Sequence, residues 1–180
     1  MSLGVSENSE SFFKFIANDQ NKSWAYYLAS VRRAVDAGVI LLGSASNDPN
    51  RNQDIENDIP SNSPGVLGVS NVNFDGVLQS AYGKNIQVAY YGTGVYVWNG
   101  FFEGFRTVKG TSFATPLVAL VAAIGKSLDP NLSSKDISKF VNSCEKKISG
   151  KRTVGSGCVF SPEKFIPHGI LPSQLEIISY

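Results

Sequence analysis

The sequence predicts an α/β domain with a mostly parallel sheet and helices on both faces of that sheet. Helix-period and strand-length apolar patterns alternate along the 180 residues, as they do in folds of this class. Residues 39–42 are apolar throughout, which is typical of a parallel strand covered on both sides. A chain that is 42% hydrophobic and 17% charged can bury a core, and its length indicates one domain.

The first expected element is a helix with one apolar face. Four apolar residues recur at i, i+4, i+7 and i+11, namely Trp24, Leu28, Val31 and Val35. Ser23 is a suitable N-cap for this helix, and Gly38 is a suitable residue to end it. The apolar face should therefore pack against the strand that follows.

Three strands are expected along the chain, at residues 39–42, 65–72 and 86–91. Between the second and the third, Asp75-Gly76 is expected to form a turn. Residues 101–108 are rich in aromatic and β-branched side chains and are expected to form a hairpin arm that leads to Ser112.

Two helices are expected in the second half of the chain. The first has Ser112 as its N-cap and Pro116 in its first turn, and it continues through the apolar run 117–124. Because that run is apolar all round, we expect this helix to be buried. The second helix begins at Ser133 or Ser134.

Ser112 is the first candidate functional residue. A helix N-terminus directs backbone N–H groups and the positive end of the helix dipole toward any negative charge that forms there. A serine hydroxyl at that position is well placed to act as a nucleophile. The alternative is a core helix whose serine is an ordinary cap.

Composition excludes several classes of function. Sixteen basic and fifteen acidic residues give a net charge of +1 without a basic run, so we expect no nucleic-acid partner. No uninterrupted apolar stretch has the length of a membrane span, so we expect no membrane partner. Residues 1–7 lack the basic and apolar regions of a signal peptide.

The two cysteines, Cys144 and Cys158, are too few for a structural zinc site and have no histidine nearby. We therefore expect no metal site and no cofactor. The pair can form a disulfide that closes a short loop, or remain as two buried thiols. The sequence leaves both possibilities open.

Three motifs in order resemble those of the subtilisin-like serine peptidases (subtilases, peptidase S8). Residues 110–116, Gly-Thr-Ser-Phe-Ala-Thr-Pro, resemble the serine motif of the family. Residues 34–48 resemble its central strand and oxyanion-hole asparagine, with Asn47 in the asparagine's place. Met1-Ser2-Leu3-Gly4 resembles a strand end that lines the substrate cleft. The resemblance covers residues 1–167 and leaves 168–180 as a C-terminal tail.

The resemblance implies a serine-type endopeptidase that acts on polypeptides. Ser112 is then the nucleophile, and Asn47 donates to the oxyanion alongside the Ser112 backbone N–H. Asn47 is otherwise a turn residue, since its surroundings are rich in turn formers. The expected substrate-binding residues are Ser2, Leu3 and Gly4, which bind an extended peptide, and Gly43, Ser44 and Ala45, which form one wall of a specificity pocket.

Asp58 is expected near the floor of that pocket, with Asp48 at its rim. Two carboxylates there favour Lys or Arg in the residue that precedes the cleaved bond. The alternative is that these loop acids are merely solvated.

The Asp and His of the family's catalytic triad are not found in this sequence. In the family both precede the Ser-Leu-Gly strand, where this chain has only Met1, and its single histidine is His168. The resemblance thus implies a domain that is incomplete at its N-terminal side, with an open sheet edge. Three explanations remain: a truncated peptidase, a non-catalytic relic or peptide-binding module, or one piece of a split enzyme whose partner is the missing N-terminal half.

The family is mostly exported, so the resemblance implies a secreted or extracytoplasmic protein. Calcium is common in the family, but no local acidic pattern here resembles a ligand loop.

Overall fold

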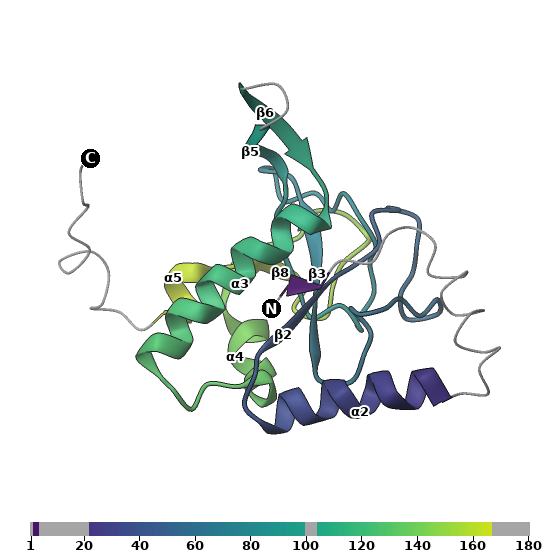
Figure 1. Cartoon of the computed structure of the whole chain (residues 1–180). Coiled ribbons are helices and arrows are strands. Elements are labelled where there is room, and N and C mark those ends of the chain that lie inside the picture. Colours follow the sequence, from purple (N-terminus) through teal and green to yellow (C-terminus); the bar gives the residue numbers. More distant parts are fainter. Residues whose placement is uncertain (1, 4–21, 100–103, 167–180) are drawn as a thin grey trace.

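The structure is a computed structural model and describes residues 2–3, 22–99 and 104–166. At its centre lies a six-stranded sheet in the order β1-β2-β3-β4-β8-β7 (Figure 1). Neighbouring strands are parallel from β1 to β8, and β7 at the edge is antiparallel to β8. The strands are β1 (Ser2–Leu3), β2 (Leu41–Ser44), β3 (Val66–Val72), β4 (Val88–Tyr91), β7 (Cys144–Lys147) and β8 (Cys158–Phe160). The predicted mostly parallel sheet is confirmed.

One face of the sheet is covered by α3 (Thr111–Leu128), with α4 (Ile137–Asn142) and α5 (Pro162–Phe165) beside it. A short 3₁₀ helix, η1 (Ser134–Asp136), leads into α4. Side chains alternate between the two sides of a strand, so alternate residues of each strand face these helices. The apolar cluster on this side includes Leu42, Val69, Val88, Val118, Phe140 and Phe160. This packing fixes α3 across the middle of the sheet.

The opposite face is covered by α2 (Lys22–Asp36) at one end and by loops at the other. Val31 of α2 packs against Leu41 and Val66, at the starts of β2 and β3. A separate cluster on the loop side includes Val72, Ile86, Ala89, Val154 and Val159. The expectation of helices on both faces is therefore correct.

Of the two residues expected to bound the first helix, Gly38 ends it as predicted, whereas Ser23 does not begin it. Ser23 lies inside α2 and does not cap it. Gly38 ends the helix with a φ of 77°, donating its N–H to Val35 O, while Val39 N–H donates to Ala34 O. These two bonds form a Schellman motif, which uses Val39 to terminate the helix. The strand expected at 39–42 consequently begins only at Leu41.

The start of α3 also differs from the expectation. Gly110 is the N-cap, with a φ of 142° that L side chains rarely adopt, and the helix begins at Thr111. Ser112 is thus the second helical residue and not the cap. Pro116 is the sixth, beyond the first turn, so it removes the N–H that would bond to the Ser112 carbonyl.

The expectation that α3 is buried on all sides is wrong. Its outer stripe, at i, i+4, i+7 and i+11, is exposed and consists of Pro116, Leu120, Ala123 and Ser127. The Leu120 side chain is 58% exposed. By length and composition α3 could cross a membrane, a test that core helices of globular domains also pass. In the described part of the chain, no segment covers the outer stripe.

A two-stranded arm, β5 (Thr93–Asn99) and β6 (Gly104–Lys109), leads into α3 and projects from the body of the molecule (Figure 1). The arm expected at 101–108 overlaps β6 at residues 104–108. Residues 101–103 lie outside the described part. The first strand of the arm was not predicted.

Cys144 and Cys158 form a disulfide between the neighbouring strands β7 and β8, with their Cα atoms 5.6 Å apart. Of the two possibilities that the sequence left open, the structure therefore has the disulfide. The expected tail, 168–180, lies outside the described residues.

Candidate functional site

Ser112 lies exposed in the first turn of α3, beside the end of β2. Its backbone N–H precedes the first intrahelical bond, so it is one of the donors that a helix leaves free at its N-terminus. Within the described residues, neither this N–H nor the Ser112 hydroxyl has a hydrogen-bond partner. Both groups are accordingly available to a ligand.

Asn47 is held against the same helix terminus by Thr111. Its side-chain oxygen Oδ1 accepts a hydrogen bond from the Thr111 backbone N–H at 3.0 Å and lies 3.2 Å from the Thr111 hydroxyl. That hydroxyl donates to Ala45 O at 2.7 Å, which ties the end of β2 to α3. With Oδ1 engaged, the Nδ2 amide of Asn47 is left as a donor without a partner in the part described. Two free donors, Asn47 Nδ2 and Ser112 N, thus lie at one end of α3.

Thr111 is the functional residue that the sequence analysis missed. It is 1% exposed and uses both its N–H and its hydroxyl to orient Asn47 and the strand before it. Its place between Gly110 and Ser112 was visible in the motif, but the hydrogen bonds to a segment far away in sequence were not.

The expected wall residues lie together at the carboxyl end of β2. Ser44 Oγ donates to Thr115 Oγ1 at 3.0 Å, which links the wall to α3. At Gly43 a Cβ would lie 2.8 Å from Ser61 N, so only glycine allows the segment around Ser61 to pack there. Ala45 is buried.

Strand β1 runs beside this wall. Ser2 pairs with Leu42, and Leu3 pairs with Gly43. Among the described strands β1 has β2 as its one neighbour, so the opposite side of β1 is an edge of the sheet. Gly4, the third expected substrate-binding residue of this segment, lies outside the described residues.

Asp58 lies buried directly behind Ser46. It is 7% exposed, and its Oδ2 accepts a hydrogen bond from Gln53 Nε2 at 2.6 Å, with the backbone of Ser46 and Ile59 nearby. Burial raises the pKa of the Asp58 carboxyl, while the charge of Arg51 and these polar groups act in the opposite direction. Asp48 is exposed, and its Oδ1 accepts from Asn50 N within its own loop.

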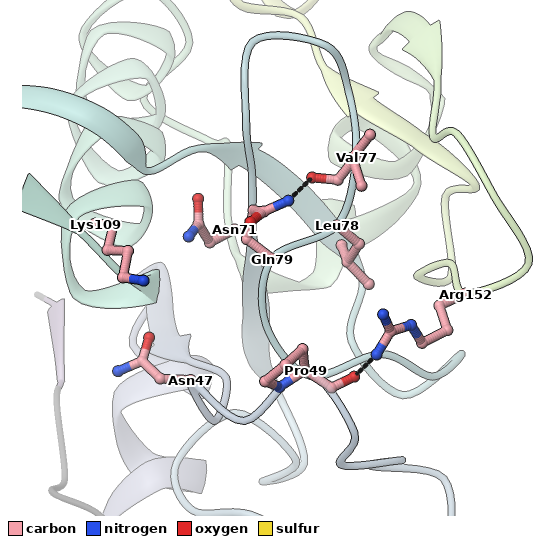
Figure 2. A pocket seen from close by; sticks show the side chains of 9 residues that line it. Asn47, Pro49, Asn71, Val77, Leu78, Gln79, Lys109 and Arg152 are labelled. Carbon is pink, nitrogen blue, oxygen red and sulfur yellow. Dashed lines mark hydrogen bonds between the residues drawn. The ribbon is translucent and has the colours of Figure 1, made fainter.

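A cavity of about 520 Å³ has Asn47 in its lining (Figure 2). It is lined by Asn47, Pro49, Asn71, Val77, Leu78, Gln79, Lys109, Gly110 and Arg152. None of the expected wall residues, and neither Asp48 nor Asp58, belongs to this lining. This cavity could not be predicted from the sequence, because its residues come from five separate segments.

The arrangement can bind an oxyanion but lacks a base for Ser112. The described residues include no histidine, and His168 lies outside them. No group of three His, Cys, Asp or Glu side chains in the described ranges could hold a metal ion. A serine hydroxyl is a weak nucleophile until a neighbouring base takes its proton.

Comparison with known proteins gives consistent matches. The model of the subtilase family matches residues 1–157. A thermostable alkaline protease of Halalkalibacterium halodurans is 33% identical over 134 residues, which make up 72% of this chain and 35% of that protein. A protease from Pseudoalteromonas arctica has a TM-score of 0.66 at 25% identity, over 77% of this chain and 45% of that one.

A cold-adapted subtilisin-like serine proteinase has a similar fold, with a TM-score of 0.63 at 22% identity over 74% of this chain and 49% of that one. The chain therefore spans about a third to a half of the length of these relatives.

Proposed function

Because this chain belongs to the subtilase family of serine peptidases, we propose that it provides the nucleophile and the oxyanion-binding groups of an endopeptidase. In this proposal Ser112 Oγ attacks the carbonyl carbon of a peptide bond. The tetrahedral oxyanion is bound by the N–H of Ser112 and by Nδ2 of Asn47. The supporting observation is that both donors are free at the N-terminus of α3, where Thr111 fixes the orientation of Asn47.

The base that activates Ser112 comes, in this proposal, from an N-terminal part of the domain that carries the family's Asp and His. Two observations support this. The chain spans about a third to a half of its relatives. The outer stripe of α3 is also exposed, with Leu120 58% accessible, although the opposite face of the helix is a core surface. Such an apolar surface on a core helix is a suitable contact for a further layer of the domain.

The substrate in this proposal is an extended polypeptide that pairs with β1 and passes the wall at Gly43, Ser44 and Ala45. Asp58 behind Ser46 favours Lys or Arg before the cleaved bond, although Gln53 already donates to its carboxylate. A peptide library cleaved by the complete enzyme tests this, since a preference for Phe or Leu would count against the charged pocket.

An extracytoplasmic location is part of the proposal. Disulfides form and persist in oxidising compartments, and Cys144–Cys158 is such a bond.

The alternative function is a peptide-binding module without catalysis, which the absence of a base among the described residues favours. The two are distinguished by fusing this chain to the N-terminal segment of the alkaline protease relative and measuring peptide hydrolysis. The peptidase proposal expects activity that Ser112→Ala abolishes. Asn47→Ala should lower that activity over a hundredfold, because losing the donor raises the activation free energy by about 3 kcal/mol. A folded fusion that binds peptides without Ser112-dependent hydrolysis would establish the alternative.

A further inference from the structure

The cavity beyond Asn47 has a cationic lining. Lys109 and Arg152 belong to it, together with the uncharged amides Asn47, Asn71 and Gln79, and no carboxylate lines it. Figure 2 shows Asn47 and Lys109 on one side of the cavity and Arg152 on the other. A cleft lined by one sign of charge concentrates ligands of the opposite sign.

The two cations differ in how they are held. Arg152 Nη1 donates to Pro49 O, and its guanidinium lies 6.0 Å from the centre of the Tyr82 ring. Arg152 is therefore engaged by the loops that form the far side of the cavity. Lys109, the last residue of β6, is exposed, and its side chain has no ion pair or hydrogen bond to any other described residue. Its ammonium group is free to pair with a ligand.

The position of the cavity relative to the oxyanion donors indicates which part of a substrate reaches it. Asn47 lines the cavity, whereas the wall at Gly43–Ala45 and the buried Asp58 do not. A peptide whose scissile carbonyl is bound at Asn47, with its preceding side chain against that wall, extends its leaving-group side toward the cavity. Successive residues of an extended peptide advance about 3.3 Å, so the first two residues of the leaving group are those within reach.

We propose that this cavity binds an acidic side chain, Asp or Glu, of the polypeptide substrate within the first two residues after the cleaved bond, and that Lys109 is its charge partner. The inference rests on the proposed function, because it assumes that a peptide occupies the cleft at Asn47. It adds a substrate preference that the nucleophile and the oxyanion donors do not determine. Lys109 acts here in substrate binding and takes no part in the chemistry.

Binding to the full chain tests the proposal without any need for hydrolysis. The probes are fluorescein-labelled octapeptides of otherwise uncharged residues, with Glu, Gln or Lys placed at each position in turn. Their dissociation constants are measured by fluorescence anisotropy. We expect Glu to tighten binding about threefold over Gln at one or two adjacent positions, as suits a partly exposed charge pair. The gain should shrink as salt is raised from about 0.15 M to 0.5 M. Lys109→Gln should remove the gain, and Lys109→Glu should transfer it to the Lys peptides.

Lys164→Glu is the matched control, because it makes the same charge change on another exposed lysine. The neighbouring Phe165 packs near Gly125, about 21 Å along α3 from Thr111. The control should keep the preference for Glu. Chemical-shift mapping on the ¹⁵N-labelled chain should show the Glu peptide perturbing Lys109, Gly110 and Gln79.

Three results would overturn the proposal and are distinguishable. Equal binding of the Glu and Gln peptides removes the acidic site and leaves the proposed peptidase function intact. A preference for Glu that survives Lys109→Glu removes Lys109 as the charge partner and likewise leaves the peptidase function intact. Failure of every peptide to bind defeats the peptide cleft, and the acidic site with it.

Discussion

Thr111 joins β2 to α3 and sets the direction in which Asn47 points. Its N–H fixes Asn47 Oδ1, and its hydroxyl binds Ala45 O, so a single residue holds the Asn47 amide at the start of α3. Ser112 could be selected from its place at the start of an apolar helix, and Asn47 from the resemblance to the family's motif. Thr111 could not be selected in this way, because its partners are more than sixty residues away in the chain.

Thr111→Val tests this positioning role, since it removes the hydroxyl and keeps the shape of the side chain. We expect the free energy of unfolding to fall by about 1 kcal/mol, because the buried Ala45 carbonyl loses its donor. In the fusion enzyme kcat should fall more than KM changes, and Thr111→Ser should restore it. Urea denaturation and steady-state kinetics measure the two effects. Equal loss in the Ser and Val variants would contradict a role for the hydroxyl.

The buried Asp58 carboxyl should make the free energy of unfolding depend on pH. Burial raises the pKa of its carboxyl above the ordinary value of 3.8. Between that value and the raised one the folded chain binds more protons than the unfolded chain, so stability falls as pH rises. Asp58→Asn should remove this slope, and the exposed Asp48→Asn should keep it. Urea titrations from pH 4 to pH 7 measure the difference, and parallel curves for wild type and Asp58→Asn would refute the assignment.

At the scale of elements, the sequence predicted which segments form strands and helices better than where they begin. Two displaced boundaries have a local cause. The Schellman motif at Gly38 and Val39 delays β2, and the conformation of Gly110 allows α3 to begin before Ser112. Both depend on backbone angles of single glycines, which hydrophobic periodicity does not report. β5 was missed because its exposed and half-buried side chains follow no clear apolar alternation.

The disulfide between β7 and β8 should stabilise this edge of the sheet. It closes a loop with a sequence separation of 14 residues. Restricting a loop of that size in the unfolded chain is worth about 3 kcal/mol in chain-entropy models. We expect the Cys144→Ser/Cys158→Ser double variant to lose roughly this free energy of unfolding in urea, and reduction of the wild type to have the same effect. Unchanged stability after either treatment would show that the bond contributes nothing.

At the scale of the molecule, the described residues form a sheet with an unpaired edge at β1 and a core helix with an exposed apolar stripe. The unpaired edge could be predicted from the resemblance, which implied further strands beside Ser2-Leu3. The exposure of the outer stripe could not be inferred, since an all-apolar helix predicts burial whether or not the covering layer is present.

Leu120→Glu tests whether the outer stripe receives the N-terminal part of the domain. A charge placed in an apolar contact is costly to desolvate, so assembly with a separate N-terminal segment should weaken at least tenfold. Lys126→Glu is unsuitable as a control, because its ammonium bonds to Pro130 and Leu132 carbonyls. Lys164 is exposed, so Lys164→Glu is a better control, and this variant should assemble normally. Calorimetry measures both, and undiminished affinity of Leu120→Glu would exclude the stripe from the contact.

The most direct test of the account is labelling of Ser112 by a fluorophosphonate, which reacts with an activated serine. The account predicts slow labelling of the chain alone, because its oxyanion donors act without a base and support only a small residual acceleration. Fusion to an N-terminal segment with the family's Asp and His should give rapid, stoichiometric labelling, located at Ser112 by mass spectrometry. Rapid labelling of the isolated chain, abolished by Ser112→Ala, would contradict the account.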